Sequence, residues 1–339
     1  MTRTRTHLAA AFVSAMLLTT AAGPADAAMA GGPVCATHTL SVRIADAGPA
    51  TETLRGRLCL PRHRRPSAVQ LLVHGATYDH RYWDFPVGGG SYSYVRAAAV
   101  AGYATFNVDR IGAGASSQPL SQRLDAVAGA AALHDVVTAL RTGAVGGRPF
   151  ARAIYVGHSL GSFIGLYGIS RYRDVDAAIL TGMLHGYNAG PADIMYPAGQ
   201  DPKFARSNLD EGYLTTRPGT RGGEYYHPAT ADPRVIAADE SGKDVTTLGP
   251  PPPMQVPHPI TVPVLLVTGA EDRLACVGVT QYDCADPESV RAHESRFFLP
   301  ETRLDVRIIP GTGHSLALST TAPATTVTML QWSRSTISP

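Results

Sequence analysis

A serine framed by two glycines is the residue of this sequence best suited to nucleophilic chemistry. Residues 157–161 are Gly-His-Ser-Leu-Gly and directly follow the apolar run 153–156. Between a strand and a helix, Gly-X-Ser-X-Gly forms a sharp turn that exposes the serine hydroxyl at the carboxyl edge of a sheet. Gly157 and Gly161 relieve the crowding that side chains would cause two residues before and after Ser159. We therefore predict that Ser159 is a nucleophile. The alternative is a glycine-rich strand–helix junction without chemistry.

A histidine and an acid follow this serine along the chain. A serine hydroxyl is a weak nucleophile and needs an adjacent base, which a third group orients. Of the twelve histidines, His314 is best placed, because it follows the last apolar run in the segment Gly-Thr-Gly-His and its loop can reach back to Ser159. Asp272, in Gly-Ala-Glu-Asp just past another apolar run, is the predicted acid. Glu271 stays open as an alternative, because spacing cannot separate adjacent loop residues. Asp109 is disfavoured because it precedes the nucleophile.

Two backbone N–H groups are predicted to stabilise the oxyanion of an acyl-transfer intermediate, which needs donors that are already in place. One belongs to Leu160, directly after the nucleophile and at a helix N-terminus. The other is expected in the segment His-Gly-Ala-Thr, residues 74–77, which follows an earlier apolar run. There we assign Ala76 as the donor, with Thr77 as a possible substitute. His74 is interpreted as a side chain that braces this loop.

The segments that must position these groups alternate between strand and helix patterns. An antiparallel pair is predicted over 39–44 and 53–60, where apolar and polar residues alternate around a turn. Later strands are short continuous apolar runs, as expected when both faces of a sheet are covered. They lie at 68–73, 103–108, 153–156, 177–180, 262–267 and 304–309, with helices at 92–101, 120–141, 160–171, 288–297 and 315–332. Strands separated by helix-length segments imply right-handed crossovers and an α/β fold with a mostly parallel central sheet flanked by helices.

One stretch, 183–258, breaks this alternation. It is rich in Gly, Pro, Tyr and Asp and has no long periodic segment. A structureless loop of this length is improbable within a compact domain, so we predict an inserted cap or lid with short helices of its own, placed before the acid-bearing strand. The catalytic domain would then comprise residues 28–182 and 259–339.

Side chains near the predicted oxyanion loop and at the start of the cap are predicted to line a substrate pocket. The loop after residue 76 is aromatic and charged, and it could equally be a surface loop whose aromatics pack on the scaffold. The cap adds Met and Tyr side chains but few charges, which favours an amphipathic organic substrate larger than acetate. The assigned pocket residues are Thr77, Tyr78, Trp83, Met183 and Leu184.

The first 27 residues have the order of a secretory signal peptide. Arg3 and Arg5 precede the uncharged run 8–22, and Ala-Asp-Ala at 25–27 is a small-residue cleavage site, with a second at 28–30. A bilayer-spanning helix needs about 20 apolar residues, so this run is too short for a stable membrane anchor. We predict a secreted protein.

Export also determines how the four cysteines are interpreted. In an oxidising compartment an even number of cysteines without Cys-X-X-Cys spacing favours disulfides over zinc. Of the three possible connectivities we prefer Cys35 with Cys59, which ties the mature N-terminus to an early strand, and Cys276 with Cys284, which closes a short loop next to the acid.

Composition narrows the classes further. The chain of 339 residues is 44% hydrophobic and 17% charged, with 29 basic against 27 acidic side chains. Ample apolar content argues against disorder, and a formal charge of +2 offers no electrostatic footprint for nucleic acid. The composition predicts a near-neutral globular protein and carries no signal for an oligomeric state.

These segments together resemble the α/β-hydrolase superfamily. The resemblance spans His74-Gly75, the turn Asp-Arg-Ile-Gly-Ala-Gly-Ala-Ser at 109–116, the serine turn, the cap and the two loops that carry the acid and the histidine. It implies a Ser-His-Asp triad and a metal-independent, cofactor-free serine hydrolase of small-molecule carboxylic esters or lactones, similar to secreted esterases and lipases. Epoxide hydrolase and dehalogenase relatives carry Asp at the nucleophile position, so Ser159 disfavours both. An amidase or peptidase of the same fold is the nearest alternative. A non-catalytic binding protein on this scaffold is disfavoured because all three triad residues are present.

Overall fold

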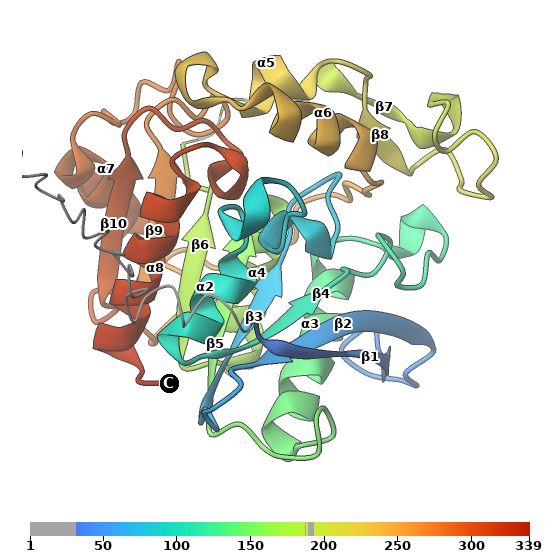
Figure 1. Cartoon of the computed structure of the whole chain (residues 1–339), viewed down its shortest axis with the longest axis vertical. Helices are drawn as coiled ribbons and strands as arrows, with labels where there is room; N and C mark the ends of the chain where they lie inside the picture. The colour runs from blue at the N-terminus through green and yellow to red at the C-terminus, as the bar shows by residue number, and fades with distance from the viewer. Residues whose placement is uncertain (1–31, 187, 189–192) are drawn as a thin grey trace, which may run out of the picture. The chain divides into compact units, whose positions relative to one another are not determined.

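An eight-stranded sheet forms the centre of the protein (Figure 1). The computed structural model describes residues 32–186, 188 and 193–339, so the predicted signal at 1–27 lies outside the described residues. The strand order is β1-β2-β4-β3-β5-β6-β9-β10. The six neighbouring strands β4, β3, β5, β6, β9 and β10 pair in parallel. At the other edge, β1 pairs antiparallel with β2, and β2 pairs antiparallel with β4. This is the mostly parallel α/β sheet predicted from the sequence.

The strands and helices lie close to their predicted positions. The sheet strands are β1 Val34–Val42, β2 Glu52–Leu60, β3 Ala68–Val73, β4 Ala104–Val108, β5 Arg152–His158, β6 Ala177–Thr181, β9 Val264–Gly269 and β10 Leu304–Ile309. The helices outside the cap are α2 Tyr94–Ala101, α3 Ala126–Thr142, α4 Leu160–Tyr172, α7 Pro287–Glu294 and α8 Ala322–Thr336. Short 3-10 turns are η1 His80–Trp83, η2 Gly88–Gly90, η3 Ser121–Arg123, η5 Ala198–Gln200, η6 Pro228–Thr230, η7 Ser295–Phe297 and η8 Leu316–Leu318.

Two predicted helices start later than expected. The helix predicted over 120–141 is a 3-10 turn followed by α3, because the Asp125 side chain accepts a hydrogen bond from the Ala128 N–H at 2.8 Å and caps a new helix there. The helix predicted over 315–332 is likewise divided, and α8 begins only at Ala322 with a proline in its first turn.

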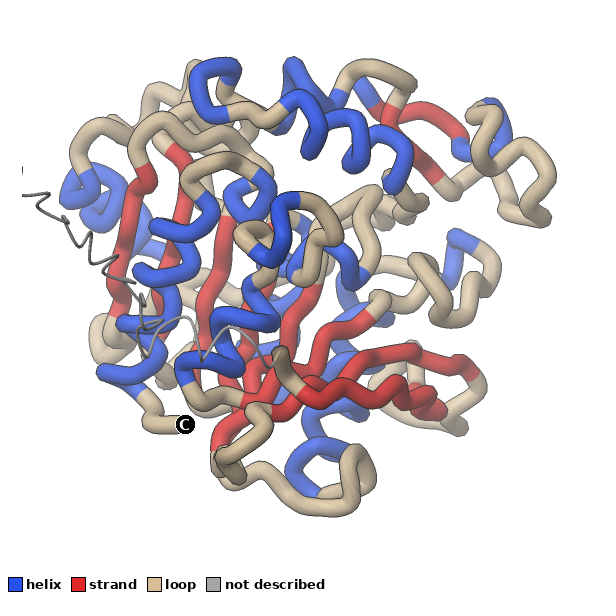
Figure 2. Tube along the Cα trace, in the orientation of Figure 1, coloured by secondary structure: helices blue, strands red, loops and turns tan. Residues whose placement is uncertain are grey.

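Two hydrophobic clusters cover the two faces of the sheet. Helices α3 and α4 pack on one face and helices α2 and α8 on the other (Figures 1 and 2). Adjacent strand residues alternate between them: Leu71 belongs to the first cluster and Leu72 to the second, and neither is exposed. Burial on both faces explains why the central strands are continuous apolar runs.

The segment predicted as a cap lies at the carboxyl end of the strands (Figure 1). It contains the predicted short helices, α5 Arg221–Tyr225 and α6 Pro233–Gly242, and in addition a two-stranded antiparallel sheet that the sequence did not predict, β7 Met195–Pro197 with β8 Leu214–Thr216. The Ser315 N–H donates to Tyr225 O at 2.9 Å, so α5 packs directly on the loop that carries His314. The exact boundaries at 183 and 258 stay a prediction.

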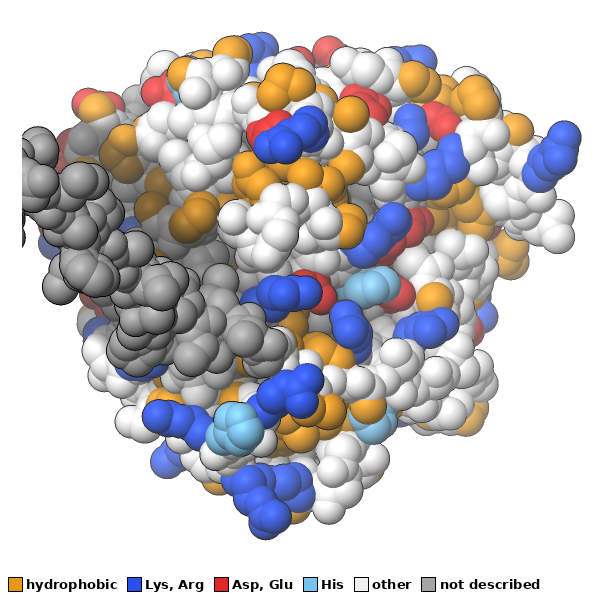
Figure 3. Space-filling view, in the orientation of Figure 1, with side chains coloured by type: hydrophobic (Ala, Val, Ile, Leu, Met, Phe, Trp, Pro, Cys, Tyr) orange, Lys and Arg blue, Asp and Glu red, His pale blue; other side chains and the backbone are white. Residues whose placement is uncertain are grey.

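The surface carries both signs of charge. On the face shown in Figure 3, basic side chains lie beside acidic and apolar ones. In the part of the chain that the structure describes, no helix combines the length and apolar character needed to cross a bilayer.

Candidate active site

Ser159 occupies a strained turn between β5 and α4. Its backbone has φ 50° and ψ −118°, a conformation that residues with a side chain seldom adopt. The Ser159 N–H donates to Thr181 O at 2.8 Å, which fixes the turn against the end of β6. Strain of this kind, maintained by the surrounding fold, is concentrated at functional sites.

The two glycines of the serine turn are required by close packing. A Cβ atom at Gly161 would lie 2.5 Å from Val73 O and 2.6 Å from His74 O, and one at Gly157 would lie 2.8 Å from Ser162 Cα. All three distances are shorter than any normal contact of a Cβ atom. The crowding predicted from the Gly-X-Ser-X-Gly spacing is therefore present.

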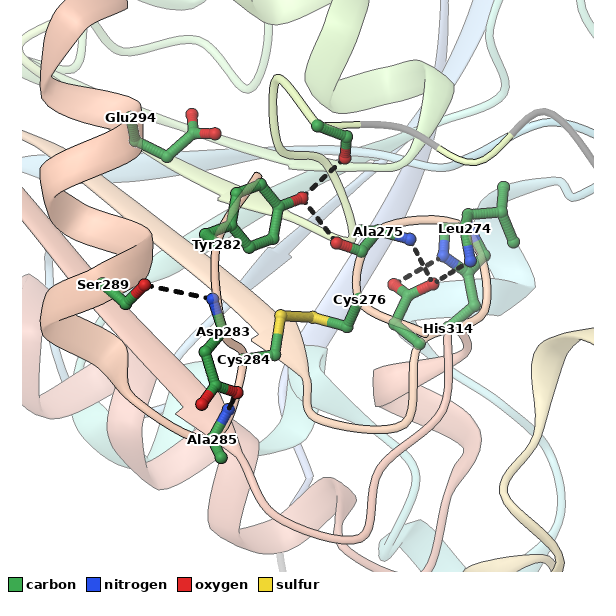
Figure 4. The surroundings of a disulfide bond; sticks show 12 residues. Leu274, Ala275, Cys276, Tyr282, Asp283, Cys284, Ala285, Ser289, Glu294 and His314 are labelled. Atoms are coloured by element: carbon green, nitrogen blue, oxygen red, sulfur yellow. Dashed lines mark hydrogen bonds and ion pairs between the residues drawn. A yellow bond between two sulfur atoms is a disulfide. The ribbon is translucent and has the colours of Figure 1, made fainter. Parts of the chain in front are cut away.

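Asp272 and His314 form a buried pair (Figure 4). The His314 Nδ1 atom lies 2.9 Å from Asp272 Oδ2, and the two side chains are 3% and 0% exposed. The other carboxylate oxygen accepts the N–H groups of Leu274 at 2.8 Å and Ala275 at 3.2 Å. The alternative acid, Glu271, makes no side-chain hydrogen bond or ion pair with any residue that the structure describes. Geometry thus separates the two adjacent acids and favours Asp272.

The serine and the histidine approach the same short stretch of backbone. Ser159 is bonded to Thr181 O, and a Cβ atom on the next residue, Gly182, would lie 3.2 Å from His314 Cε1. Ser159 and His314 are both among the described residues, and no hydrogen bond joins Ser159 Oγ to His314 Nε2 in the structure. Such bonds are often long in free enzymes and shorten when substrate binds.

Two backbone N–H groups beside Ser159 have no partner among the residues that the structure describes. They belong to Ala76 and Leu160, the two donors predicted from the sequence. The loop that carries Ala76 abuts the serine, because a Cβ atom on Gly75 would lie 3.1 Å from Ser159 Cβ. Unpaired N–H groups next to a nucleophile are available to an oxyanion.

Comparison with known proteins assigns the fold family. The model of the alpha/beta hydrolase family matches residues 70–327. The chain belongs to this family. Among curated proteins, none matches the chain.

Several solved structures share this alpha/beta hydrolase fold. A thermophilic esterase from Thermogutta terrifontis, solved with malate bound, has a TM-score of 0.59 and 17% identity over 89% of this chain and 99% of that chain. Carboxylesterase CesB from Bacillus subtilis has a TM-score of 0.54 and 18% identity over 91% and 94%. A hydrolase from Pseudomonas aeruginosa has a TM-score of 0.55 and 14% identity over 87% and 97%. At these identities the likeness shows the fold.

His74 braces the loop that carries Ala76, the predicted oxyanion donor of this alpha/beta hydrolase. It is fully buried, its Nε2 accepts the Arg110 N–H at 3.0 Å, and its Nδ1 lies 2.9 Å from Gly75 O. Burial, together with the Arg110 charge, lowers the pKa of His74 to about 3. The ring is therefore neutral at physiological pH and acts as one donor and one acceptor, consistent with the bracing role inferred from the sequence.

His158, directly before Ser159, lies beside the predicted triad, and the sequence interpretation missed it. Its ring stacks on Tyr82 at 4.2 Å between centroids and lies 4.9 Å from the His314 ring. Burial holds the pKa of His158 well below its ordinary value, and the neighbouring His314 acts in the same direction. His158 thus packs as a neutral ring beside His314. Its position within the serine turn was the available signal.

Three of the predicted pocket residues belong to the scaffold. Trp83 is 1% exposed and packs edge-on against Tyr82 and Tyr94, and Leu184 is 3% exposed within the first core cluster. Met183 is half-buried and packs against the same cluster. Trp83 and Leu184 pack into the two core clusters, where burial of apolar area stabilises the fold, and their assignment to a substrate pocket stays a prediction.

The remaining two, Thr77 and Tyr78, are buried against the cap. Thr77 is unexposed with φ 59°, and its Oγ1 accepts a hydrogen bond from Arg221 of α5 at 2.8 Å. The Tyr78 hydroxyl lies 2.6 Å from Ser315 Oγ, next to His314. These two side chains connect the loops of the site, and their assignment to a substrate pocket stays a prediction.

A small pocket of about 50 Å³ instead opens beside Leu160. Its lining is mostly apolar and comes from α3, α4, the turn after β4 and the end of the cap. The residues are Leu54, Arg110, Ile111, Leu124, Asp125, Ala126, Gly129, Leu133, Leu160, Phe163, Ile164, Thr247, Leu248, Gly249 and Pro250. None of the five predicted pocket residues is among them.

All four cysteines are paired as predicted. The Cys35–Cys59 bridge joins directly opposed residues of β1 and β2. The Cys276–Cys284 bridge lies beside the acid (Figure 4), where the Cys276 N–H donates to Asp272 O at 2.8 Å.

Tyr282 anchors the same loop from within the bridged segment. Its hydroxyl lies 2.6 Å from both Ala275 O and Gly186 O (Figure 4). Because Ala275 N–H is one of the two donors to Asp272, this hydroxyl ties the acid-binding backbone to the start of the cap.

One group among the described residues has a spacing that could hold a metal ion: Asp79, His80 and Asp109. Its members are already engaged by protein groups. Asp79 forms an ion pair with Arg81, and His80 Nδ1 lies 2.7 Å from Asp109 Oδ1. The Asp109 turn therefore serves the architecture of the site.

Proposed function

We propose that this alpha/beta hydrolase is a secreted serine hydrolase that cleaves carboxylic esters or lactones. The observation that carries the proposal is the buried Asp272–His314 pair, with its carboxylate fixed by two N–H groups, beside a serine on a strained turn. Two solved structures of the same fold are described as an esterase and a carboxylesterase, which supports ester hydrolysis.

The proposed reaction proceeds through an acyl-enzyme. His314 Nε2 takes the Ser159 proton as Oγ attacks the ester carbonyl carbon, and the N–H groups of Ala76 and Leu160 bind the resulting oxyanion. The C–O bond then breaks, and the alcohol leaves with the proton from His314. Water, activated by the same ring, hydrolyses the acyl-enzyme and regenerates Ser159. Asp272 holds the proton on Nδ1 throughout and stabilises the imidazolium.

The pocket beside Leu160 suggests a short acyl group. One water position needs roughly 10–15 Å³ of such volume, so a pocket of about 50 Å³ accepts only a few heavy atoms. Because Leu160 directly follows Ser159 and lines this pocket, we propose that the acyl chain of a bound ester enters it. We expect esters of short acids to be preferred. The amphipathic character expected of a substrate larger than acetate would then belong to its alcohol part.

Secretion is part of the same proposal. Residues 1–27 have the order of a signal peptide, and both disulfides are of the kind that persists in oxidising compartments. Expression with the full N-terminus in a secreting host should yield protein outside the cells that starts near residue 28. Retention of residues 1–27 in the exported protein would contradict the cleavage site.

Covalent labelling tests the chemistry. A fluorophosphonate should label the wild type and not Ser159→Ala, and p-nitrophenyl butyrate turnover should be lost with the labelling. Ser170→Ala in α4 is a matched control, because the Ser170 hydroxyl only donates to Leu166 O within the helix. An unlabelled wild type, or undiminished labelling of Ser159→Ala, would refute the mechanism.

A further inference from the structure

A buried ion pair in the cap is bonded to the loop that carries the proposed oxyanion donor. Arg221 of α5 and Asp239 of α6 are 0% and 2% exposed at their side chains. Two parallel hydrogen bonds join them, Nε to Oδ2 at 2.9 Å and Nη2 to Oδ1 at 2.8 Å. This bidentate geometry fixes the guanidinium plane, and the third nitrogen, Nη1, donates to Thr77 Oγ1 at 2.8 Å.

Thr77 needs such a constraint because its backbone is strained. It has a φ of 59°, follows Ala76 directly and is completely buried. The Thr77 carbonyl accepts the Asp244 N–H at 2.9 Å, so the cap contacts both the side chain and the backbone of this residue. The Gly75–Ala76 peptide, which carries the Ala76 N–H, lies one residue before Thr77, so a change in the Thr77 backbone would displace the short loop that holds this N–H.

The same ion pair reaches the histidine loop through two tyrosines. The Arg221 guanidinium lies over the Tyr78 ring at 4.3 Å, and the Tyr78 hydroxyl lies 2.6 Å from Ser315 Oγ. The Arg221 guanidinium also lies 5.1 Å from the centre of the Tyr225 ring. That ring packs 5.6 Å from the His314 ring, between centroids. One cap guanidinium thus contacts the loop of Thr77 and Tyr78 directly, and it reaches the His314 loop only through the two tyrosines.

We propose that Arg221, held by Asp239, is a positioning residue of this hydrolase: it keeps Thr77 in its strained conformation and thereby aims the Ala76 N–H at the oxyanion. This inference rests on the proposed function. It assigns the α5–α6 part of the cap a role in assembling the site. An ion pair that served stability alone could be replaced by apolar side chains of similar volume, often at little cost.

The test compares Arg221→Met with the double variant Arg221→Met/Asp239→Leu. The single variant leaves Asp239 buried without its partner and is expected to lower the melting temperature. The double variant removes both charges and is expected to recover part of the melting temperature, since the Tyr226 hydroxyl, which donates to Asp239 Oδ2 at 2.8 Å, then loses this acceptor. In both variants, kcat for p-nitrophenyl butyrate, measured well below the melting temperature, should fall by about 10²-fold with KM little changed, since misaligning one oxyanion donor costs about 10²–10³.

Two further variants separate positioning from general damage. Thr77→Val removes the acceptor for Arg221, so its kcat loss should not add to that of Arg221→Met when the two are combined. Arg234→Met in α6 removes a guanidinium from an ion pair that is 80% exposed at the arginine, and it should keep both kcat and stability. A double variant at Arg221 and Asp239 that folds and keeps kcat within about threefold of the wild type overturns the inference, as does a kcat loss shared by Arg234→Met. Failure of the proposed function would instead appear as an inactive, unlabelled wild type.

Discussion

Replacing Asp272 by asparagine should reverse the tautomer of His314. In the structure Asp272 Oδ1 accepts two N–H groups, from Leu274 and Ala275, while Oδ2 faces His314 Nδ1 at 2.9 Å. An amide in this position can satisfy the two donors only with its oxygen, so its NH₂ group must face His314. The ring nitrogen Nδ1 then has to accept a hydrogen bond, and the proton moves to Nε2, which can no longer take the proton of Ser159.

The expected loss is about 10⁴-fold in kcat, the size found when an acid of a serine triad is converted to its amide. That factor corresponds to about 5.4 kcal/mol of transition-state stabilisation. The fold itself should lose only about 1 kcal/mol, because the amide oxygen still accepts both backbone N–H groups and the side chain keeps its volume. Activity and stability are therefore expected to separate clearly.

The assay is steady-state hydrolysis of p-nitrophenyl butyrate by Asp272→Asn, with urea unfolding of the same sample. Glu271→Gln is the matched control, since it makes the same chemical change one residue away, at a side chain that forms no bond to His314. We expect the control to keep wild-type kcat. If Asp272→Asn retains a tenth or more of the activity, the acid has been misassigned. A large loss in Glu271→Gln alone would exchange the two roles.

Three other perturbations test the turn, the acid loop and the buried ring. Gly161→Ala places a Cβ atom 2.5 Å from Val73 O. It should destabilise the fold by about 1–3 kcal/mol and abolish turnover. Unchanged urea unfolding would mean that the turn is not crowded. Cys276→Ala/Cys284→Ala opens a loop with a sequence separation of 8 and should cost about 2–3 kcal/mol in thermal unfolding. The kcat of this variant should fall even at temperatures where it is fully folded. A wild-type kcat at those temperatures would mean that the bridge does not help to position Asp272. For His158 the folded pKa lies below the unfolded one, so stability is lost as pH falls through about 6.5, where the unfolded chain takes up a proton that the folded chain does not. Lowering the pH from 7.5 to 5.5 should therefore reduce the free energy of unfolding of the wild type by about 1.4 kcal/mol through this residue. His158→Phe should not show that contribution, and equal pH slopes would contradict it.

The sheet was predictable because burial on both faces leaves a strong signal. The runs 68–73 and 304–309 coincide with β3 and β10, where apolar side chains serve both core clusters. Helix starts were less accessible, because they depend on single side chains such as the Asp125 cap, which apolar periodicity does not register.

The residues proposed for chemistry were also predictable, to a point. The glycine spacing around Ser159 follows from packing constraints that are local in sequence, and the order serine, acid, histidine follows from loops at one edge of the sheet. The choice between Glu271 and Asp272 depended on which carboxylate meets the N–H groups of the following turn. That is a three-dimensional fact without a sequence pattern.

The pocket residues show where composition ceases to inform. An aromatic side chain beside a site can line a cavity or fill the core, and Trp83 does the second because Tyr82 and Tyr94 enclose it. The pocket that the structure shows beside Leu160 is assembled from segments between Leu54 and Pro250, and no local pattern links them.

Arg221 illustrates the same limit for charge. It is 18 residues from Asp239 and 144 from Thr77, so neither helical nor strand spacing joins these residues, and in the sequence Arg221 resembles any solvated arginine. Only burial reveals its importance. A fully buried guanidinium must be paired and hydrogen-bonded or it destabilises the fold severely. Here the hydrogen bonds that satisfy it end on the loop beside the nucleophile, so the energetic requirement of one cap side chain also determines the geometry at Ala76.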